Sequence, residues 1–192
     1  MTTFDAVLSD LDGVIRQFDH EEQEAIEARY GLPLMKTALR PDLILPPTVG
    51  KMSEREWLAA VAAELGGTED ALRAVEEFRE QRFWVDEEVR KLLAKAQERV
   101  PLIIVTNAMD TLDEHLDRIG LTYFADAVVS SAKVGVAKPD PRIYILAAEL
   151  AGVAPERCLF IDDRLENVEA ARRLGMTGVH FRSAEDLVPI LA

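Results

Sequence analysis

Short apolar runs alternate with helical segments over the second half of the chain, and this pattern leaves few folds open. The apolar runs, with one near the amino terminus, lie at 6–8, 102–105, 127–129, 159–161 and 178–181. The helical segments between them, each followed by a glycine, lie at 110–119, 141–151 and 166–174. Continuous apolar runs are typical of strands buried on both faces of a parallel sheet. The alternation therefore predicts an α/β fold with a doubly wound, five-stranded parallel sheet.

A long segment of helical pattern separates the first predicted strand from the second. Its predicted helices lie at 21–30, at 53–65 after a capping box formed by Ser53 and Glu56, at 69–83 and at 86–100. The prolines that prevent one continuous helix are Pro33, Pro41, Pro46 and Pro47. We interpret residues 16–85 as a small helical cap over the end of the first strand, with residues 1–15 and 86–192 forming the α/β core.

The overall charge restricts the partners of the chain. There are 22 Lys and Arg against 35 Asp and Glu, which gives a net charge of −13. Such a field repels nucleic-acid backbones and anionic lipid headgroups, so we expect no nucleic-acid or membrane partner. A small anionic metabolite still fits if a bound cation reverses the sign of the charge in one pocket. A single cysteine, Cys158, and the lack of a bilayer-length apolar run are typical of a cytoplasmic protein.

Polar clusters directly follow three of the five predicted strands, and a fourth lies in the loop after the strand at 127–129. The clusters, in chain order, are Asp10-Leu11-Asp12-Gly13, Thr106-Asn107, Lys138-Pro139 and Asp162-Asp163. Because the carboxyl ends of the strands in a doubly wound sheet share one edge, we expect these clusters to converge on one crevice. The four aspartates would then bring up to four negative charges together, which is unfavourable unless a cation neutralises them. All-oxygen ligands favour Mg²⁺, and Lys138 with the Thr106 hydroxyl would complete a site for a phosphoryl group.

The spacing of the first cluster predicts covalent catalysis. Asp10 and Asp12 are separated by one residue, so their side chains should point the same way from an extended strand end. Asp10 as a nucleophile would divide hydrolysis into an aspartyl-phosphate step and a water step, with Asp12 as the acid and then the base. Gly13 would leave room where the backbone passes close to substrate. Each cluster taken alone is also explained as a turn, a fragment of a calcium loop or a helix cap. The order of all the clusters together, each near a strand end, favours phosphoryl transfer.

These clusters resemble the four motifs of the haloacid-dehalogenase-like hydrolases, in the same order and over nearly the whole chain. The matching segments are Asp10-Leu11-Asp12-Gly13-Val14, Thr106-Asn107, Lys138-Pro139-Asp140-Pro141 with Ile143-Tyr144, and Phe160-Ile161-Asp162-Asp163 with Asn167-Val168. The resemblance implies a Mg²⁺-dependent phosphatase that acts on a small phosphorylated metabolite, such as a sugar phosphate. The insertion after the first motif resembles the helical cap of the subfamily with sugar-phosphate phosphatases, phosphoglycolate phosphatases and β-phosphoglucomutases.

The resemblance also implies a role for each matched residue. Asp10 is implied as nucleophile and metal ligand, and Asp12 as an acid/base whose backbone carbonyl also contacts the metal. The implied phosphate binders are Thr106, Asn107 and Lys138. Asp163 is implied as a metal ligand, with Asp162 beside it either on the metal or one layer behind.

Other functions stay open on the same residues. The namesake dehalogenases lack an aspartate at the position of Asp12, so phosphate chemistry is favoured over dehalogenation. A mutase similar to β-phosphoglucomutase and a catalytically silent protein that binds a phosphorylated ligand are the alternatives. Response-regulator receivers use similar groups, but there the lysine ends the series, whereas here Asp162 and Asp163 follow Lys138.

Several residues of the insertion and the three histidines have no assigned role. Arg16 is either a substrate-selecting cation at the hinge or an exposed surface arginine. We assign no catalytic role to the histidines, which are His20, His115 and His180. The large aromatic residues of the insertion, Trp57, Phe83 and Trp84, either pack its small core or face a partner, which leaves a monomer or a homodimer open.

Overall fold

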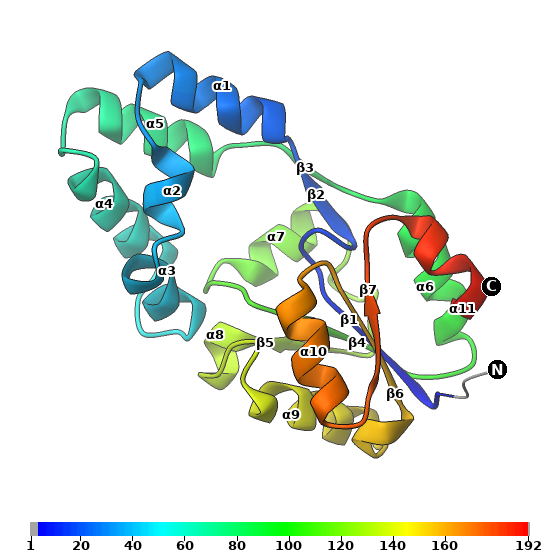
Figure 1. Ribbon diagram of the computed structural model, residues 1–192. Coiled ribbons are helices and arrows are strands. Elements are labelled where there is room, and N and C mark those ends of the chain that lie inside the picture. Colours follow the sequence, from blue (N-terminus) through cyan, green and yellow to red (C-terminus); the bar gives the residue numbers. More distant parts are fainter. Residues whose placement is uncertain (1–3, 192) are drawn as a thin grey trace.

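The computed structural model describes residues 4–191 and contains a five-stranded parallel sheet in the order β5-β4-β1-β6-β7 (Figure 1). The strands are β1 (Ala6–Ser9), β4 (Leu102–Thr106), β5 (Ala127–Ser130), β6 (Cys158–Asp162) and β7 (Thr177–His180). All five predicted strands are present, and helices flank the sheet, which confirms the predicted α/β fold. Residues 1–3 and 192, which belong to the predicted core, lie outside the described residues.

Each face of the sheet has its own apolar core. One core lies under α6 (Glu87–Gln97), α7 (Leu112–Arg118) and α11 (Val188–Leu191), and the other under α9 (Pro141–Ala151) and α10 (Leu165–Arg173). In β1, Val7 packs into the first core while Ala6 and Leu8 pack into the second. Successive side chains of a strand point to opposite faces, so a strand with helices on both sides must be apolar throughout.

The position of β1 in the sheet determines what surrounds the residues that follow it. Ser9, the last residue of β1, pairs with Ile104 of β4 on one side and with Ile161 of β6 on the other. The Asp10 amide continues this pairing by donating to the Ile161 carbonyl at 2.8 Å. The first acidic cluster therefore emerges between the carboxyl ends of β4 and β6.

The segment between the first two sheet strands forms a separate helical group (Figure 1). Its helices are α1 (His20–Tyr30), α2 (Leu34–Ala38), α3 (Pro41–Thr48), α4 (Glu54–Glu64) and α5 (Glu69–Arg79). They pack around their own apolar cluster, which includes Leu34, Trp57 and Val61. The predicted capping box of α4 is confirmed, because the Ser53 hydroxyl accepts from the Glu56 amide at 3.2 Å and the Glu56 carboxylate accepts from the Ser53 amide at 2.8 Å.

Two strands that were not predicted connect the helical group to the sheet. β2 (Arg16–Phe18) and β3 (Phe83–Val85) pair antiparallel, with Phe18 opposite Phe83. The helix predicted at 69–83 is therefore too long and ends at Arg79. Phe83, the last residue of the predicted helix, is in β3 because it pairs with a residue more than sixty positions earlier, which a local periodicity does not reveal.

The proline-rich part of the helical group is more helical than predicted. The chain breaks at Arg40, as expected, but α2 and α3 are both present and Pro46 and Pro47 lie inside α3. Pro41 begins α3, where its missing N–H loses no helical hydrogen bond. The remaining elements are the short helix α8 (Ser131–Val134) and the 3₁₀ helices η1 (Pro155–Arg157) and η2 (Ala184–Asp186). Within residues 4–191, no helix combines the length and the apolar character that a membrane crossing needs.

Candidate active site

The residues singled out at the strand ends come together at one edge of the sheet. Asp10 follows β1, Thr106 ends β4 and Asp162 ends β6. Lys138 reaches the same place from the loop between α8 and α9, and its ammonium lies 2.7 Å from both Asp10 Oδ2 and Asp162 Oδ2. The predicted convergence on one crevice is thus present in the fold for these four residues.

Three carboxylates form a compact acidic group there. One oxygen each from Asp10, Asp162 and Asp163 lies within 4.8 Å of the others. With Lys138 as their only close ammonium within the described chain, three carboxylates leave two formal negative charges. This surplus and the all-oxygen donor set suit a divalent cation such as Mg²⁺. Two oxygens bound to one Mg²⁺ lie at most about 4.2 Å apart, so small side-chain movements would close the group around the ion.

Burial makes this arrangement electrostatically demanding. Burial raises the pKa of Asp10 well above its usual range, and the charge of Lys138 opposes that rise while Asp162 adds to it. Burial also lowers the pKa of Lys138, but the charges of Asp10 and Asp162 outweigh this effect and leave the pKa raised. The neighbours that partly cover the Asp163 carboxyl raise its pKa by desolvation, and the charge of Asp162 raises it further. A cation at this position would favour the ionised form of all three carboxyl groups.

Asp162 and Asp163 differ in what holds their carboxylates. The fully buried Asp162 accepts from the Arg164 amide at 2.8 Å and from Asn167 Nδ2 at 3.0 Å, in addition to Lys138. Asp163 is exposed, and no side chain of residues 4–191 forms a hydrogen bond or ion pair with its carboxylate. Asp162 is therefore oriented by protein donors, whereas the Asp163 oxygens are available to a ligand.

Gly13 is required by the neighbouring acidic group. Its φ of +76° belongs to the left-handed region, which glycine adopts readily. A Cβ at this position would lie 2.4 Å from Asp163 Oδ2. Sequence reasoning expected the close neighbour of Gly13 to be substrate, and the structure shows that it is the Asp163 carboxylate.

Thr106 and Asn107 have different surroundings although they are adjacent. The Thr106 hydroxyl is one of two buried side-chain polar atoms, with Ser130 Oγ, that lack a hydrogen-bond partner in the part of the chain described. An unpartnered buried hydroxyl at the crevice suits a ligand oxygen. The Asn107 amide is instead engaged with the Lys138 backbone, donating to its carbonyl at 2.9 Å and accepting from its amide at 2.8 Å. Asn107 thus holds Lys138 in place with one of its two amide N–H groups and its oxygen.

Asp12 does not join the acidic group, so the expected cluster of four carboxylates is corrected to three. Its carboxylate is held by Arg16, whose Nη2 donates to Asp12 Oδ2 at 2.9 Å while Nε donates to Oδ1. The Arg16 guanidinium also lies 5.2 Å from the ring centroids of both Phe18 and Phe83. The two rings, whose centroids are 6.1 Å apart, both contact the guanidinium and add cation–π attraction to the ion pair that holds it. Arg16 is buried, so its alternative assignment as an exposed surface residue is wrong.

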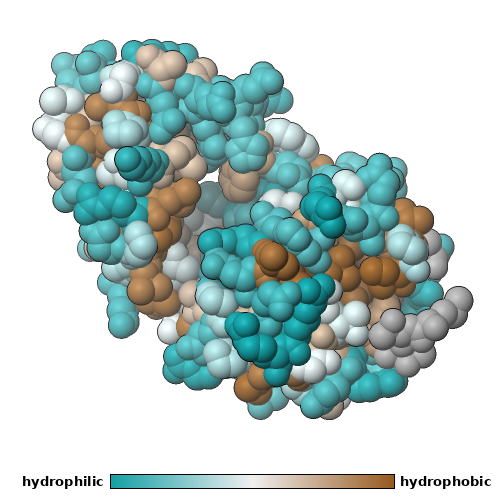
Figure 2. All heavy atoms as spheres, in the orientation of Figure 1, coloured by the Kyte–Doolittle hydropathy of each residue, from teal (hydrophilic) through white to brown (hydrophobic). Residues whose placement is uncertain are grey.

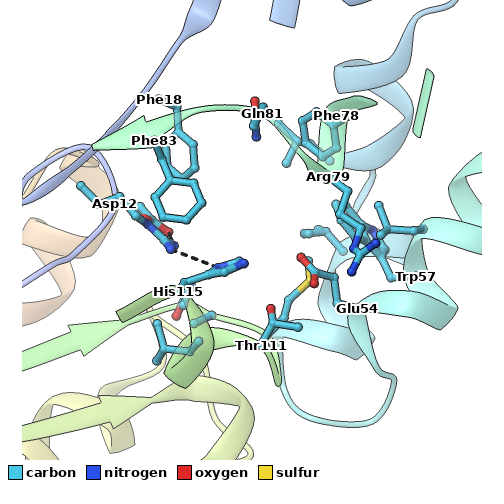
Figure 3. A pocket seen from close by; sticks show the side chains of 18 residues that line it. Asp12, Phe18, Glu54, Trp57, Phe78, Arg79, Gln81, Phe83, Thr111 and His115 are labelled. Carbon is cyan, nitrogen blue, oxygen red and sulfur yellow. Dashed lines mark hydrogen bonds and ion pairs between the residues drawn. The ribbon is translucent and has the colours of Figure 1, made fainter. Parts of the chain in front are cut away.

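His115 is a site residue that sequence reasoning missed. Its Nδ1 lies 3.2 Å from Arg16 Nη1, and its ring centroid lies 5.1 Å from that of Phe83 (Figure 3). Burial lowers the pKa of His115, and the charge of Arg16 lowers it further. The contact with Arg16 spans 99 residues of sequence, and no local pattern around His115 indicates it.

A cavity of about 200 Å³ opens beside Asp12 and Asn107, between the helical group and the sheet. Figure 2 shows the molecule as two lobes with a hollow between them. The cavity walls come from both lobes, with Trp57 and Phe78 from the helical group and Phe83 and His115 from the side nearer the sheet (Figure 3). The three large aromatic residues of the insertion differ in exposure: Trp57 is buried here, Phe83 is half-buried and Trp84 is exposed.

Known proteins with similar sequences are phosphatases. A phosphoserine phosphatase of Thermus thermophilus is 33% identical over 166 residues, which make up 83% of this chain and 64% of that protein. A phosphatase of Mycobacterium tuberculosis is 32% identical over 184 residues, which make up 89% of this chain and 84% of that protein. The chain therefore spans just under two thirds of the T. thermophilus relative and more than four fifths of the M. tuberculosis one.

Solved structures share the fold. A HAD family enzyme from Bacteroides thetaiotaomicron, in complex with magnesium and inorganic phosphate, superposes with a TM-score of 0.73 at 22% identity, covering 91% of this chain and 92% of that one. An L-2-haloacid dehalogenase from Xanthobacter autotrophicus gives a TM-score of 0.64 at 25% identity, covering 91% and 76%. Residues 4–175 also match a family model described as haloacid dehalogenase-like hydrolase. The match extends over most of the chain and confirms the resemblance of its motifs, so the chain belongs to the haloacid dehalogenase-like hydrolase family.

Proposed function

We propose that this protein is a Mg²⁺-dependent phosphatase that hydrolyses a small phosphomonoester through an aspartyl-phosphate at Asp10. The observation that carries the proposal is the grouping of the Asp10, Asp162 and Asp163 carboxylates around one position, with the Lys138 ammonium in contact with both Asp10 and Asp162 and the unpartnered Thr106 hydroxyl at the end of the neighbouring strand. The phosphatase names of the relatives support the same reaction class. The net charge of −13 favours a small metabolite over nucleic acid or a membrane surface as the partner.

The chemistry of the chain's own residues divides into two steps. An Asp10 carboxylate oxygen attacks phosphorus and forms an O–P bond. The bond between phosphorus and the leaving oxygen breaks, and the leaving oxygen keeps the electron pair and takes a proton from Asp12. Asp12 then accepts a proton from water, whose oxygen attacks phosphorus and releases inorganic phosphate and the Asp10 carboxylate. Arg16 orients the Asp12 carboxylate in its ionised form, which is the form that accepts the proton from water in the second step.

The remaining residues bind the metal and the phosphoryl group. In this proposal Mg²⁺ is held by the carboxylates of Asp10 and Asp163 and by the Asp12 backbone carbonyl, with Asp162 fixed beside it. When bound, the cation offsets the negative charge of the carboxylates and the phosphoryl oxygens. Lys138 and the Thr106 hydroxyl contact phosphoryl oxygens, and Asn107 contributes by holding the Lys138 backbone.

We assign residues 16–85 as a cap domain and residues 1–15 with 86–192 as the catalytic core. The helical group has its own apolar cluster and is joined to the core through the β2–β3 pair, which supports this division. The cap side of the cavity would then contact the leaving group. We place the enzyme in the cytoplasm, as its single cysteine suggests.

Release of phosphate from 4-nitrophenyl phosphate tests the proposal. We expect turnover by the native protein with Mg²⁺, loss of turnover with EDTA, and recovery when Mg²⁺ is restored. Asp10→Asn should be folded and inactive, since the amide is not a nucleophile. A native protein without turnover in Mg²⁺, across aryl and sugar phosphates, would favour a silent ligand-binding protein instead.

A further inference from the structure

The cavity beside Asp12 is mostly apolar and fits one ring. Its walls include the rings of Phe18, Trp57, Phe78 and Phe83 (Figure 3). An apolar cavity of about 150 Å³ is enough for benzene, so about 200 Å³ accommodates one ring with a short substituent. The body of the leaving group that best fits these walls is therefore flat and apolar.

Both arginines of the cavity wall are already paired with carboxylates. Arg16 and Asp12 form a two-bond ion pair at the end nearest the catalytic site. Arg79 is exposed and lies 2.9 Å from Glu76 and 3.7 Å from Glu80. These contacts leave no strong net charge at either arginine.

Glu54 is the exception within the described residues. It is half-buried, it lines the cavity across from Phe18 and Phe83, and it forms no ion pair with any residue of 4–191 (Figure 3). Burial raises its pKa, a hydrogen bond from Thr111 and the charge of Arg79 lower it, and Asp110 and Glu114 raise it again. A carboxylate that has a hydrogen-bond donor but no ion pair, in a partly dry wall, would gain from a cationic group placed opposite it.

We propose that the natural substrate is a phosphomonoester whose leaving alcohol has a flat apolar body and a cationic amino group that binds Glu54. This inference rests on the proposed phosphatase function, because Asp12 and Asn107 belong to both the catalytic end and the cavity wall. The phosphoryl group lies at Asp10, the apolar body lies between the aromatic rings, and the ammonium donates to the Glu54 carboxylate. Glu54 is then a specificity-determining residue.

A structural role alone would also account for an acidic residue at this position. Glu54 is the first residue of α4, where a negative charge is favoured by the helix dipole. Glu69 is the first residue of α5 after a similar Thr cap, but it lines no part of this cavity. The Glu69→Gln variant therefore controls for the loss of a helix-terminal charge.

Three aryl phosphates with the same ring and different charges on the para substituent test the inference. They are 4-(2-aminoethyl)phenyl phosphate, 4-ethylphenyl phosphate and 4-(2-carboxyethyl)phenyl phosphate, which carry a cation, no charge and an anion. We expect the native protein to prefer the cationic ester over the neutral one by about tenfold or more in kcat/KM, since a charge-assisted hydrogen bond is worth at least that. Glu54→Gln should bring this ratio close to one, Glu54→Lys should shift the preference to the anionic ester, and Glu69→Gln should leave the native ratio.

The outcomes separate the inference from the proposed function. Equal kcat/KM for the cationic and neutral esters, or a preference that survives Glu54→Gln, would overturn the role of Glu54 while leaving the phosphatase function intact. A lack of turnover of all three esters and of 4-nitrophenyl phosphate would overturn both.

Discussion

Among single residues, Lys138 is a buried cation that neutralises two buried carboxylates at once. Its ammonium is buried with two carboxylates 2.7 Å away, and only 1% of its side chain is accessible. Neither Asp10 nor Asp162 has another cationic side chain at that distance within the described residues. Removing one partner of such a group leaves an uncompensated buried charge, which is far more costly than losing a surface pair.

Replacing Lys138 with methionine should therefore destabilise the protein strongly. In EDTA we expect Lys138→Met to lower the free energy of unfolding by about 3 kcal/mol or more, because two buried carboxylates lose their counter-charge. Lys133→Met removes an exposed ion pair with Asp113 and should change the free energy of unfolding by less than about 1 kcal/mol. Urea denaturation of the two variants measures the difference, and similar small losses would contradict the assigned burial energetics.

Among the local elements, the turn after β1 connects backbone conformation to metal binding. Gly13 has a positive φ and faces the Asp163 carboxylate. The nearest atom to an added Cβ is the far end of the Asp163 side chain, which can rotate away. An added methyl group should therefore disturb the position of a metal ligand more than the fold itself.

The Gly13→Ala variant separates these two effects. We expect a loss of about 1–2 kcal/mol in stability from the left-handed conformation and, in addition, Mg²⁺ affinity that is lower by about tenfold or more. Gly31→Ala has a similar positive φ, at +64°, with nothing within 4 Å of the added Cβ. Calorimetric Mg²⁺ titration should find native affinity in Gly31→Ala, and equal Mg²⁺ affinity in both variants would argue against Asp163 as a ligand.

At the scale of the whole molecule, the helical group rests on the core at a second place besides β2 and β3. Ser131 Oγ, in α8 of the core, donates to the Thr48 carbonyl at 2.6 Å. Close by, a Cβ on Gly50 would lie 2.2 Å from the Ala132 carbonyl oxygen. Backbone atoms meet backbone atoms here, so neither side can give way by changing a rotamer. We expect this contact to help set the distance between the two walls of the cavity.

Gly50→Ala should push the two lobes apart at this contact. A misplacement of about 1 Å can reduce activity by about 100-fold, so we expect kcat/KM for 4-nitrophenyl phosphate to fall by at least tenfold. Gly67→Ala, in the same helical group, has a positive φ of +62° but open space around the added Cβ. Steady-state kinetics of the pair give the test, and equal kcat/KM would mean that the α8 contact does not control the site.

Local sequence patterns are enough to predict the sheet, most helices and the edge of the sheet at which the catalytic side chains gather. Apolar runs and helical periods are local properties, and parallel strands bring their carboxyl ends to one edge whatever lies between them. This is why Asp10, Thr106, Lys138 and Asp162 could be assigned to one crevice without coordinates.

The pairing of the side chains around that crevice depends on the tertiary structure and is not predicted from the sequence. The Arg16–His115 contact, the Asn107 clamp on Lys138 and the β2–β3 pair join segments that are 99, 31 and more than sixty residues apart. Such pairings depend on which surfaces meet after folding, and no period or spacing in the chain encodes them locally. For the same reason, the lack of an ion pair at Glu54 depends on where its charged neighbours lie in the fold and is not visible in the sequence.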